Sequence, residues 1–278
     1  MLSKSKIGNV TARILLWMWV LFTFFIISLA VMNSFKTSAE IYTNLWAIPV
    51  SINWANYENA LFTSQMYRYF FNSVFICVMT LLILTIISAM AAYILARFPF
   101  KGKWIITALV VFGLGVPEQL LLIPLYRTIS AMGLVNSFTG MITVYTSLCV
   151  PFTIFVLIGF FTSLPNDIRE AAIIDGASES YTFWKVMFPL AQPGLIAVAS
   201  FNFVWMWNEY LLALVFTNDK SVRTMSLGMY ALQNSMTFTI DWGALYAGVV
   251  LMFVPAVIVF ILLHKYIISG ITLGAVKG

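Results

Sequence analysis

Few side chains in this sequence can do chemistry, and most of them lie far apart along the chain. Glu209 is a formal charge well inside an apolar run, where a carboxylate binds a polar solute or hydrogen-bonds a neighbouring helix. His264 is the single histidine, and Cys77 and Cys149 are the two cysteines. A metal site needs three or four ligands, and acid–base or nucleophilic catalysis needs paired groups. The sequence therefore predicts no metal site, no catalytic residues and no enzyme activity in this chain.

Four of the ten acidic residues lie in one polar stretch, residues 164–192. They are Asp167, Glu170, Asp175 and Glu179. Asp167 and Glu170 have the spacing of a capping box, which marks the start of a helix. Gly176 is suited to the left-handed residue that follows a helix end. We therefore expect a short helix over 168–175, ended by a glycine corner.

A second short helix is expected immediately after this corner. Ser178 or Ser180 is suited to cap its start, and Pro189 is expected to end it. The first helix carries two adjacent isoleucines, Ile173 and Ile174, which a water-exposed connector does not need. Either the stretch is a simple elbow between two larger segments, or a partner protein docks on it. Its length and its double capping favour docking.

The composition sets the environment of these elements. Hydrophobic residues make up 62% of the chain and charged residues 9%, far from the balance of a soluble domain. A bilayer crossing needs about 20 apolar helical residues. Six such runs are present, so we expect an all-α integral membrane protein that forms one domain over 1–278. The expected spans are 14–32, 70–95, 104–122, 138–161, 193–216 and 244–267, with Pro117 and Glu118 interrupting the third.

The basic residues predict how the chain is oriented. Six spans place both termini on one side, and most of the 15 Lys and Arg residues fall on that side. Under the positive-inside rule the termini are cytoplasmic, and so is the 164–192 loop. The net charge of +5 is dispersed among apolar segments, so nucleic acid is not an expected partner.

The cytoplasmic loop resembles a known motif. The loop is similar to the EAA loop of ABC importer permeases in Glu170, Ala171, Ala172, Gly176 and, after nine intervening residues, the run 186–189 ending in Pro189. The family pattern ends in Ile-x-Leu-Pro, from which Val186 and Phe188 are conservative departures. Further similarity to the maltose-type (MalG-like) carbohydrate permeases runs along almost the whole chain. It includes Ser34-Phe35-Lys36, Ala96-Arg97-Phe98, Val116-Pro117-Glu118-Gln119, Ile123-Pro124-Leu125-Tyr126, Trp207-Asn208-Glu209 and Gly274-Ala275-Val276-Lys277-Gly278.

This resemblance implies a type I ABC importer permease fold in a bacterial or archaeal cell (inner) membrane. It implies a second homologous permease subunit, an ABC ATPase dimer that binds ATP and Mg, an extracytoplasmic sugar-binding protein, and no cofactor on this chain. The residues implied to contact the ATPase are Glu170, Ala171, Ala172, Asp175, Gly176, Ala177 and Pro189. The C-terminal residues Val276 and Lys277 are implied to contact it as well.

The substrate pathway is less well defined by the residues. Trp205, Trp207, Asn208 and Glu209 are candidates to line or gate a polar sugar path. Alternatively, the two polar residues hydrogen-bond a neighbouring helix while the tryptophans join an aromatic belt, and the sister permease forms the sugar site. External stretches such as 33–69 suit docking of a binding protein, or are solvated loops.

Two functions remain to be separated. One is a membrane subunit of an ATP-driven importer, with a neutral di- or oligosaccharide preferred because the external segments hold few basic residues. The other is a self-sufficient secondary transporter of a small polar solute. The latter normally needs ionisable groups in the middle of the membrane, where this chain offers Glu209.

Overall fold

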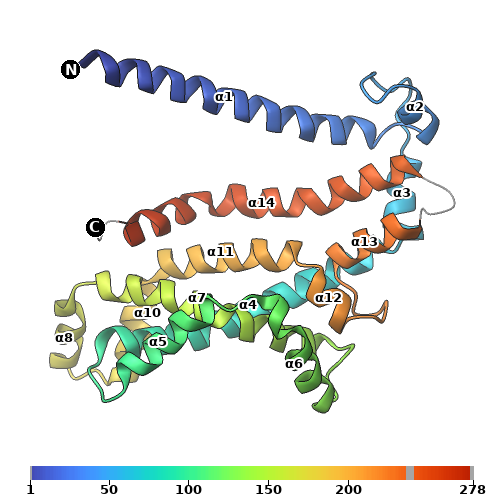
Figure 1. Ribbon diagram of the computed structural model, residues 1–278. Coiled ribbons are helices and arrows are strands. Elements are labelled where there is room, and N and C mark those ends of the chain that lie inside the picture. Colours follow the sequence, from blue (N-terminus) through green and yellow to red (C-terminus); the bar gives the residue numbers. More distant parts are fainter. Residues whose placement is uncertain (1, 236–240, 276–278) are drawn as a thin grey trace. The chain divides into compact units, whose positions relative to one another are not determined.

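The computed structural model describes residues 2–235 and 241–275, which form helices and no strand (Figure 1). The longer helices are α1 (Leu2–Asn33), α4 (Met66–Arg97), α5 (Lys103–Leu114), α6 (Glu118–Ala131), α7 (Phe138–Ser163), α11 (Gln192–Asn208), α13 (Met225–Ser235) and α14 (Trp242–Ala275). The shorter ones are α2 (Ser38–Thr43), α3 (Ala55–Glu58), α8 (Asn166–Ile174), α9 (Glu179–Thr182), α10 (Phe188–Leu190) and α12 (Leu211–Phe216), with π-helical turns η1 (Asn59–Thr63) and η2 (Phe183–Met187).

Among the residues that the structure describes, four helical stretches are long and apolar enough to cross a membrane. They are Val10–Asn33, Met66–Arg97, Phe138–Ser163 and Trp242–His264. These confirm four of the six expected spans. The third expected span overlaps the bent pair Lys103–Leu114 and Glu118–Ala131, and the fifth overlaps the second helix of the bent pair Glu179–Leu190 and Gln192–Asn208. If each pair counts as one span, the described residues hold up to six spans.

The bend in the third span is an angle of 106° between α5 and α6. Three residues separate the two helices, and Pro117 stands at the N-cap of α6 with an extended backbone. A residue before proline is disfavoured in the helical conformation, so Val116 is poorly suited to continue α5. The interruption expected at Pro117 and Glu118 is confirmed, but α5 ends at Leu114.

The fifth span also departs from the expected run over 193–216. Its main helix, α11, ends at Asn208, and α12 begins at Leu211 after a break at Glu209 and Tyr210. At its other end, α11 meets the α9–α10 stretch at an angle of 70°. Apolar composition marks all these residues as membrane-compatible, but it does not record the breaks between the helices.

The chain divides into two compact units. One comprises Met1–Tyr67 and Gly228–Val254, and the other comprises Arg68–Leu227 and Pro255–Gly278. The second unit has a core in which α4, α7, α11 and η2 meet. The fully or nearly buried residues of this core are Ala89, Ala92, Tyr93, Leu95, Ile154, Leu157, Phe161, Phe183, Met187, Ala191, Leu195 and Val198.

Small residues set the helix packing of the second unit. A Cβ added to Gly194 on α11 would run into the Phe160 ring of α7, and one added to Gly113 on α5 would lie 2.9 Å from Pro151 Cγ of α7. Glycine lets helix backbones approach closely in membranes, where the hydrophobic effect does not drive helix association. Both glycines therefore fix α5 and α11 against α7.

Candidate functional site

The first helix of the 164–192 loop is α8, which lies at one end of the second unit, beyond α7 and α10 (Figure 1). Gly176 has a φ of +85°, the left-handed conformation expected for it. Its N–H donates to Ile173 O at 3.0 Å, and Ala177 N–H donates to Ala172 O at 3.0 Å. These two bonds form a Schellman motif, so the glycine corner is confirmed and α8 has a defined end.

The start of α8 differs from the expectation. The helix begins at Asn166, with Pro165 at the N-cap and no side-chain cap. The expected capping box of Asp167 and Glu170 does not form, because Asp167 already lies inside the first turn. Proline at this position costs the helix no hydrogen bond, since its missing N–H would have had no helical partner.

Arginine replaces the capping box in holding this end. Arg97, the last residue of α4, donates from Nη2 to Leu164 O at 2.6 Å and from Nη1 to Asn166 Oδ1. A guanidinium presents several donors in a fixed plane, so it can hold two neighbouring residues at once. Arg97 therefore ties the start of α8 to the C-terminal end of α4.

A second arginine holds α8 from its inner side. The Arg169 guanidinium lies 4.7 Å from the centre of the Phe98 ring and forms an ion pair with Glu179. Burial lowers the pKa of Arg169, but the hydrogen bond and charge of Glu179 outweigh this effect and raise it. Tyr93 OH also approaches Glu179 Oε2, at 3.5 Å. These contacts join α8 to α9 and both to the end of α4.

The second short helix anchors the loop in the core. Ser178 Oγ accepts from Tyr181 N at 3.2 Å, which confirms Ser178 as a cap. The helix continues through the η2 turn, whose Phe183 and Met187 are buried. Pro189 does not end it as expected: it lies in the first turn of α10, and the chain bends only at Ala191. The π-helical turn ends at Met187, two residues before Pro189, which has no N–H to continue the regular hydrogen-bond ladder.

This arrangement leaves the outer face of α8 open. No residue of α8 is buried, and Ile174 is 84% exposed. Glu170, Ala171, Asp175 and Gly176 are exposed, Ala172 and Ala177 are half-buried, and Pro189 is exposed on α10. A short helix that is fixed at both ends and displays apolar side chains can transmit force from a docked protein into the core.

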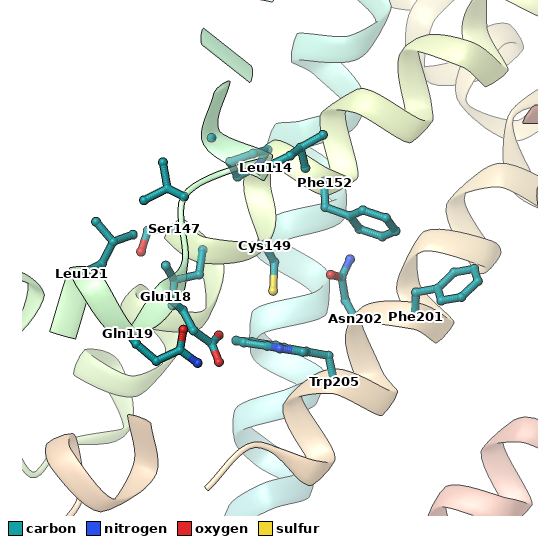
Figure 2. Close-up of a pocket in the computed structure, with 14 residues that line it drawn as sticks. Leu114, Glu118, Gln119, Leu121, Ser147, Cys149, Phe152, Phe201, Asn202 and Trp205 are labelled. Carbon is teal, nitrogen blue, oxygen red and sulfur yellow. The ribbon is translucent and has the colours of Figure 1, made fainter. Parts of the chain in front are cut away.

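A cavity of about 730 Å³ lies in the second unit where the α5–α6 bend faces α7 and α11. Its aromatic wall is formed by Phe152, Phe201 and Trp205. Its polar groups include Glu118, Gln119, Ser147 and Asn202 (Figure 2). Aromatic faces together with hydrogen-bonding groups are the mixed lining that binds a polar organic solute.

Glu118 is the charged residue among those that line this cavity in the described part of the chain. It begins α6, so the bend at Pro117 turns its carboxylate toward the same space as Trp205 (Figure 2). Asn202 lies deeper and donates to Thr153 Oγ1 at 2.9 Å. The sequence placed neither residue in a site. The proline–acid pair inside an apolar run was the available signal for Glu118.

Glu209 does not line the cavity. It is 7% exposed, and its carboxylate accepts from Leu212 N at 2.6 Å, Ala213 N at 3.2 Å and Tyr145 OH at 2.9 Å. The first two bonds cap the start of α12. Glu209 therefore stabilises the break between α11 and α12 and bonds the neighbouring helix α7, which is one of the two roles considered for it.

The other pathway candidates lie in separate places. Trp205 lines the cavity, whereas Trp207 is fully buried against Phe70 and Phe203. The exposed Asn208 donates to Val204 O of its own helix at 2.8 Å. Val276 and Lys277 lie outside the described residues.

This chain is similar to permease proteins of known transport systems. It is 38% identical to the diacetylchitobiose uptake system permease protein NgcG of Streptomyces coelicolor, over 88% of this chain and 82% of that protein. It is 37% identical to the trehalose/maltose transport system permease protein MalG of Thermococcus litoralis, over 76% of this chain and 75% of that protein.

One solved structure shares the fold. A chain from a bacterial ABC transporter involved in the import of the acidic polysaccharide alginate matches with a TM-score of 0.81 and 21% identity, over 94% of this chain and 96% of that one. The family described as binding-protein-dependent transport system inner membrane component matches residues 85–272, which include α8 and the cavity. The chain belongs to this family of inner-membrane transport components.

Proposed function

We propose that this chain is one permease subunit of an ATP-driven sugar importer, with both termini in the cytoplasm. It forms half of the pathway beside a second permease subunit, and a sugar-binding protein delivers the substrate from outside. ATP and Mg²⁺ bind to a partner ATPase dimer. The family membership and the sugars in the names of the relatives support this assignment.

The main support for this proposal is that α8 is held in place by side-chain contacts while its outer face is exposed. Its outer face offers Glu170, Ala171 and Ile174 to a partner, while Arg97 and Arg169 fix it to α4 and α9. When a docked ATPase moves, α8 would therefore move α4 and α9 with it instead of bending by itself. A connector without a partner has no use for an isoleucine that is 84% exposed.

For the substrate we propose a neutral sugar rather than an anionic one. Glu118 places a negative charge on the cavity wall, where a carboxylate-bearing sugar meets electrostatic repulsion. Ser147, Gln119 and Asn202 offer hydrogen bonds to hydroxyl groups, and the ring of Trp205 offers an apolar face. These groups suit a neutral di- or oligosaccharide.

Purification of the tagged chain from its own membranes tests the assignment. We expect an ABC ATPase and a second permease subunit to purify with it, and sugar uptake by the reconstituted complex to need ATP and the binding protein. If the chain alone imports a sugar in proteoliposomes, driven by an ion gradient and abolished by an ionophore, it is a secondary transporter and the proposal is wrong.

A further inference from the structure

The loop that follows α1 displays apolar side chains on a charge-free surface. Residues 41–57 contain no Asp, Glu, Lys or Arg. Within this stretch Ile48 is 82% exposed and Val50 is 92% exposed, and Trp46 and Trp54 are exposed beside them. Exposed apolar side chains clustered in this way mark a surface that contacts something other than water.

Buried polar side chains hold the backbone of this loop, although its large apolar side chains are exposed. Lys36 is 1% exposed, and its ammonium group donates to Asn44 O at 3.3 Å and Leu45 O at 2.9 Å. Asn56 donates to the carbonyls of Ser34 and Lys36, at 2.8 Å each. Lys36, the nearest basic residue in the sequence, is therefore buried inside the loop and adds no positive charge to its outer surface.

Backbone groups of the loop are satisfied by side chains rather than left to water. Asn44 Oδ1 accepts from Trp46 N at 3.0 Å and Ala47 N at 3.2 Å, and Glu40 Oε1 accepts from Val50 N at 3.2 Å. Pro49 has no N–H to satisfy. Irregular backbone near a bilayer needs such internal partners, because the hydrocarbon offers none.

The position of Trp46 indicates what covers this surface. Its indole stacks on the Phe25 ring of α1, with 5.9 Å between ring centres and an interplanar angle of 11°. Phe25 lies eight residues before the end of α1 at Asn33, or about 12 Å along the helix. The apolar stretch Val10–Asn33 is about 36 Å long, only slightly more than a bilayer core. Trp46 therefore reaches back beside a membrane-spanning segment.

We propose that residues 45–54 form an interfacial anchor, with the loop backbone among the lipid headgroups and Trp46, Ile48 and Val50 in the adjacent acyl region. The leaflet is the one at the Asn33 end of α1. Tryptophan is enriched at this depth because its ring is apolar and its N–H is polar. Neutral, apolar loops fit this boundary, and a soluble binding protein cannot reach below it. Docking of such a protein on the 33–69 stretch then falls to residues outside the anchor.

Spin labels test the anchor in the complex with which the chain purifies, reconstituted in vesicles of phosphatidylethanolamine and phosphatidylglycerol. Labels are placed by Ile48→Cys and Val50→Cys in a background where the buried Cys77 and Cys149 are replaced by alanine. Lys220→Cys, in an exposed turn, is the water-facing control. Both loop positions have little contact with their own unit, so the label does not threaten folding.

We expect collisions with oxygen to exceed collisions with a soluble nickel chelate severalfold at positions 48 and 50, and the reverse at position 220. High nickel access at 48 and 50 would show that the loop stands in water. Low access to both reagents would show that a second protein subunit covers it. Either result would overturn the proposal, and neither depends on whether the complex imports sugar.

Discussion

The 164–192 loop and the cavity of the second unit are built in opposite ways. The loop is a continuous stretch whose shape is set by the Schellman motif at Gly176, the cap at Ser178 and the N-cap proline Pro165. The cavity draws its walls from three distant stretches, 113–121, 147–152 and 201–205. Changes in the loop should therefore act on partner binding, and changes in the cavity should act on the solute.

The two regions also differ in how they use charge. In the loop, Arg97 and Arg169 are occupied in holding α8 in place. In the cavity wall, Glu118 has no described salt-bridge partner and faces the space that a solute would enter. We therefore propose that charge positions α8 in the loop and selects the solute in the cavity.

Gly176→Val is the substitution expected to disturb the loop conformation most. A β-branched residue with a φ near +85° costs up to about 3 kcal/mol, enough to reduce the docking conformation by up to roughly a hundredfold. We expect ATPase co-purification and sugar uptake to collapse while membrane insertion continues. Gly102→Val is the matched control, because Gly102 has a φ of +87° and equally open surroundings outside the loop. Equal losses in the two variants would contradict a specific role of the corner.

Arg97→Met removes the tether at the start of α8. Loss of its hydrogen bonds to Leu164 and Asn166 should destabilise the tethered loop by about 1.5 kcal/mol. This lowers the ratio of tethered to untethered loop by about tenfold. We expect ATP hydrolysis by the purified complex to continue while transport per ATP falls. Lys101→Met, which removes an exposed charge nearby, should leave that ratio unchanged. An unaltered ratio in the Arg97 variant would show that α8 needs no tether.

Glu118→Gln tests selection by charge in the cavity. Removing the negative charge should favour an anionic substrate by about 1 kcal/mol, or about fivefold, because like charges no longer repel. The measurement is uptake of the sugar that the binding protein delivers against uptake of its uronic acid analogue. Glu58→Gln removes an exposed charge outside the cavity and serves as the control. If both variants discriminate like the natural chain, Glu118 does not select.

Tyr145→Phe should have the smallest effect and act on stability alone. It removes one of the three hydrogen bonds to Glu209, worth about 0.5–1 kcal/mol. We expect a slightly lower Tm in detergent and an unchanged KM for the sugar, with no change in Tm for the exposed Tyr67→Phe. A raised KM would instead place Glu209 in the solute path.

The sequence predicted the loop better than the cavity for a physical reason. Gly176 and Ser178 act on their own neighbours in the chain, so their spacing is enough to place a corner and a cap. The capping box of Asp167 and Glu170 was wrong because α8 already begins at Asn166. The side chain that holds its start is Arg97, 67 residues before Leu164. Such a contact cannot be read from local spacing.

The pathway residues show the same limit. Trp205, Trp207, Asn208 and Glu209 are neighbours in the sequence, yet one lines the cavity, one is buried, one bonds its own helix and one caps the next helix. Successive residues of a helix point in different directions, so nearness along the chain does not bring side chains to one site.

By itself, the sequence determined that this is a membrane protein, where its apolar runs lie, and where the 164–192 loop turns. Composition and short-range backbone preferences decide these features. Only the tertiary structure decided how sharply the third span bends, where the fifth span breaks, that Glu118 faces a cavity and Glu209 does not, and that Trp46 stacks on Phe25 of α1. Those outcomes depend on contacts between residues far apart in the chain.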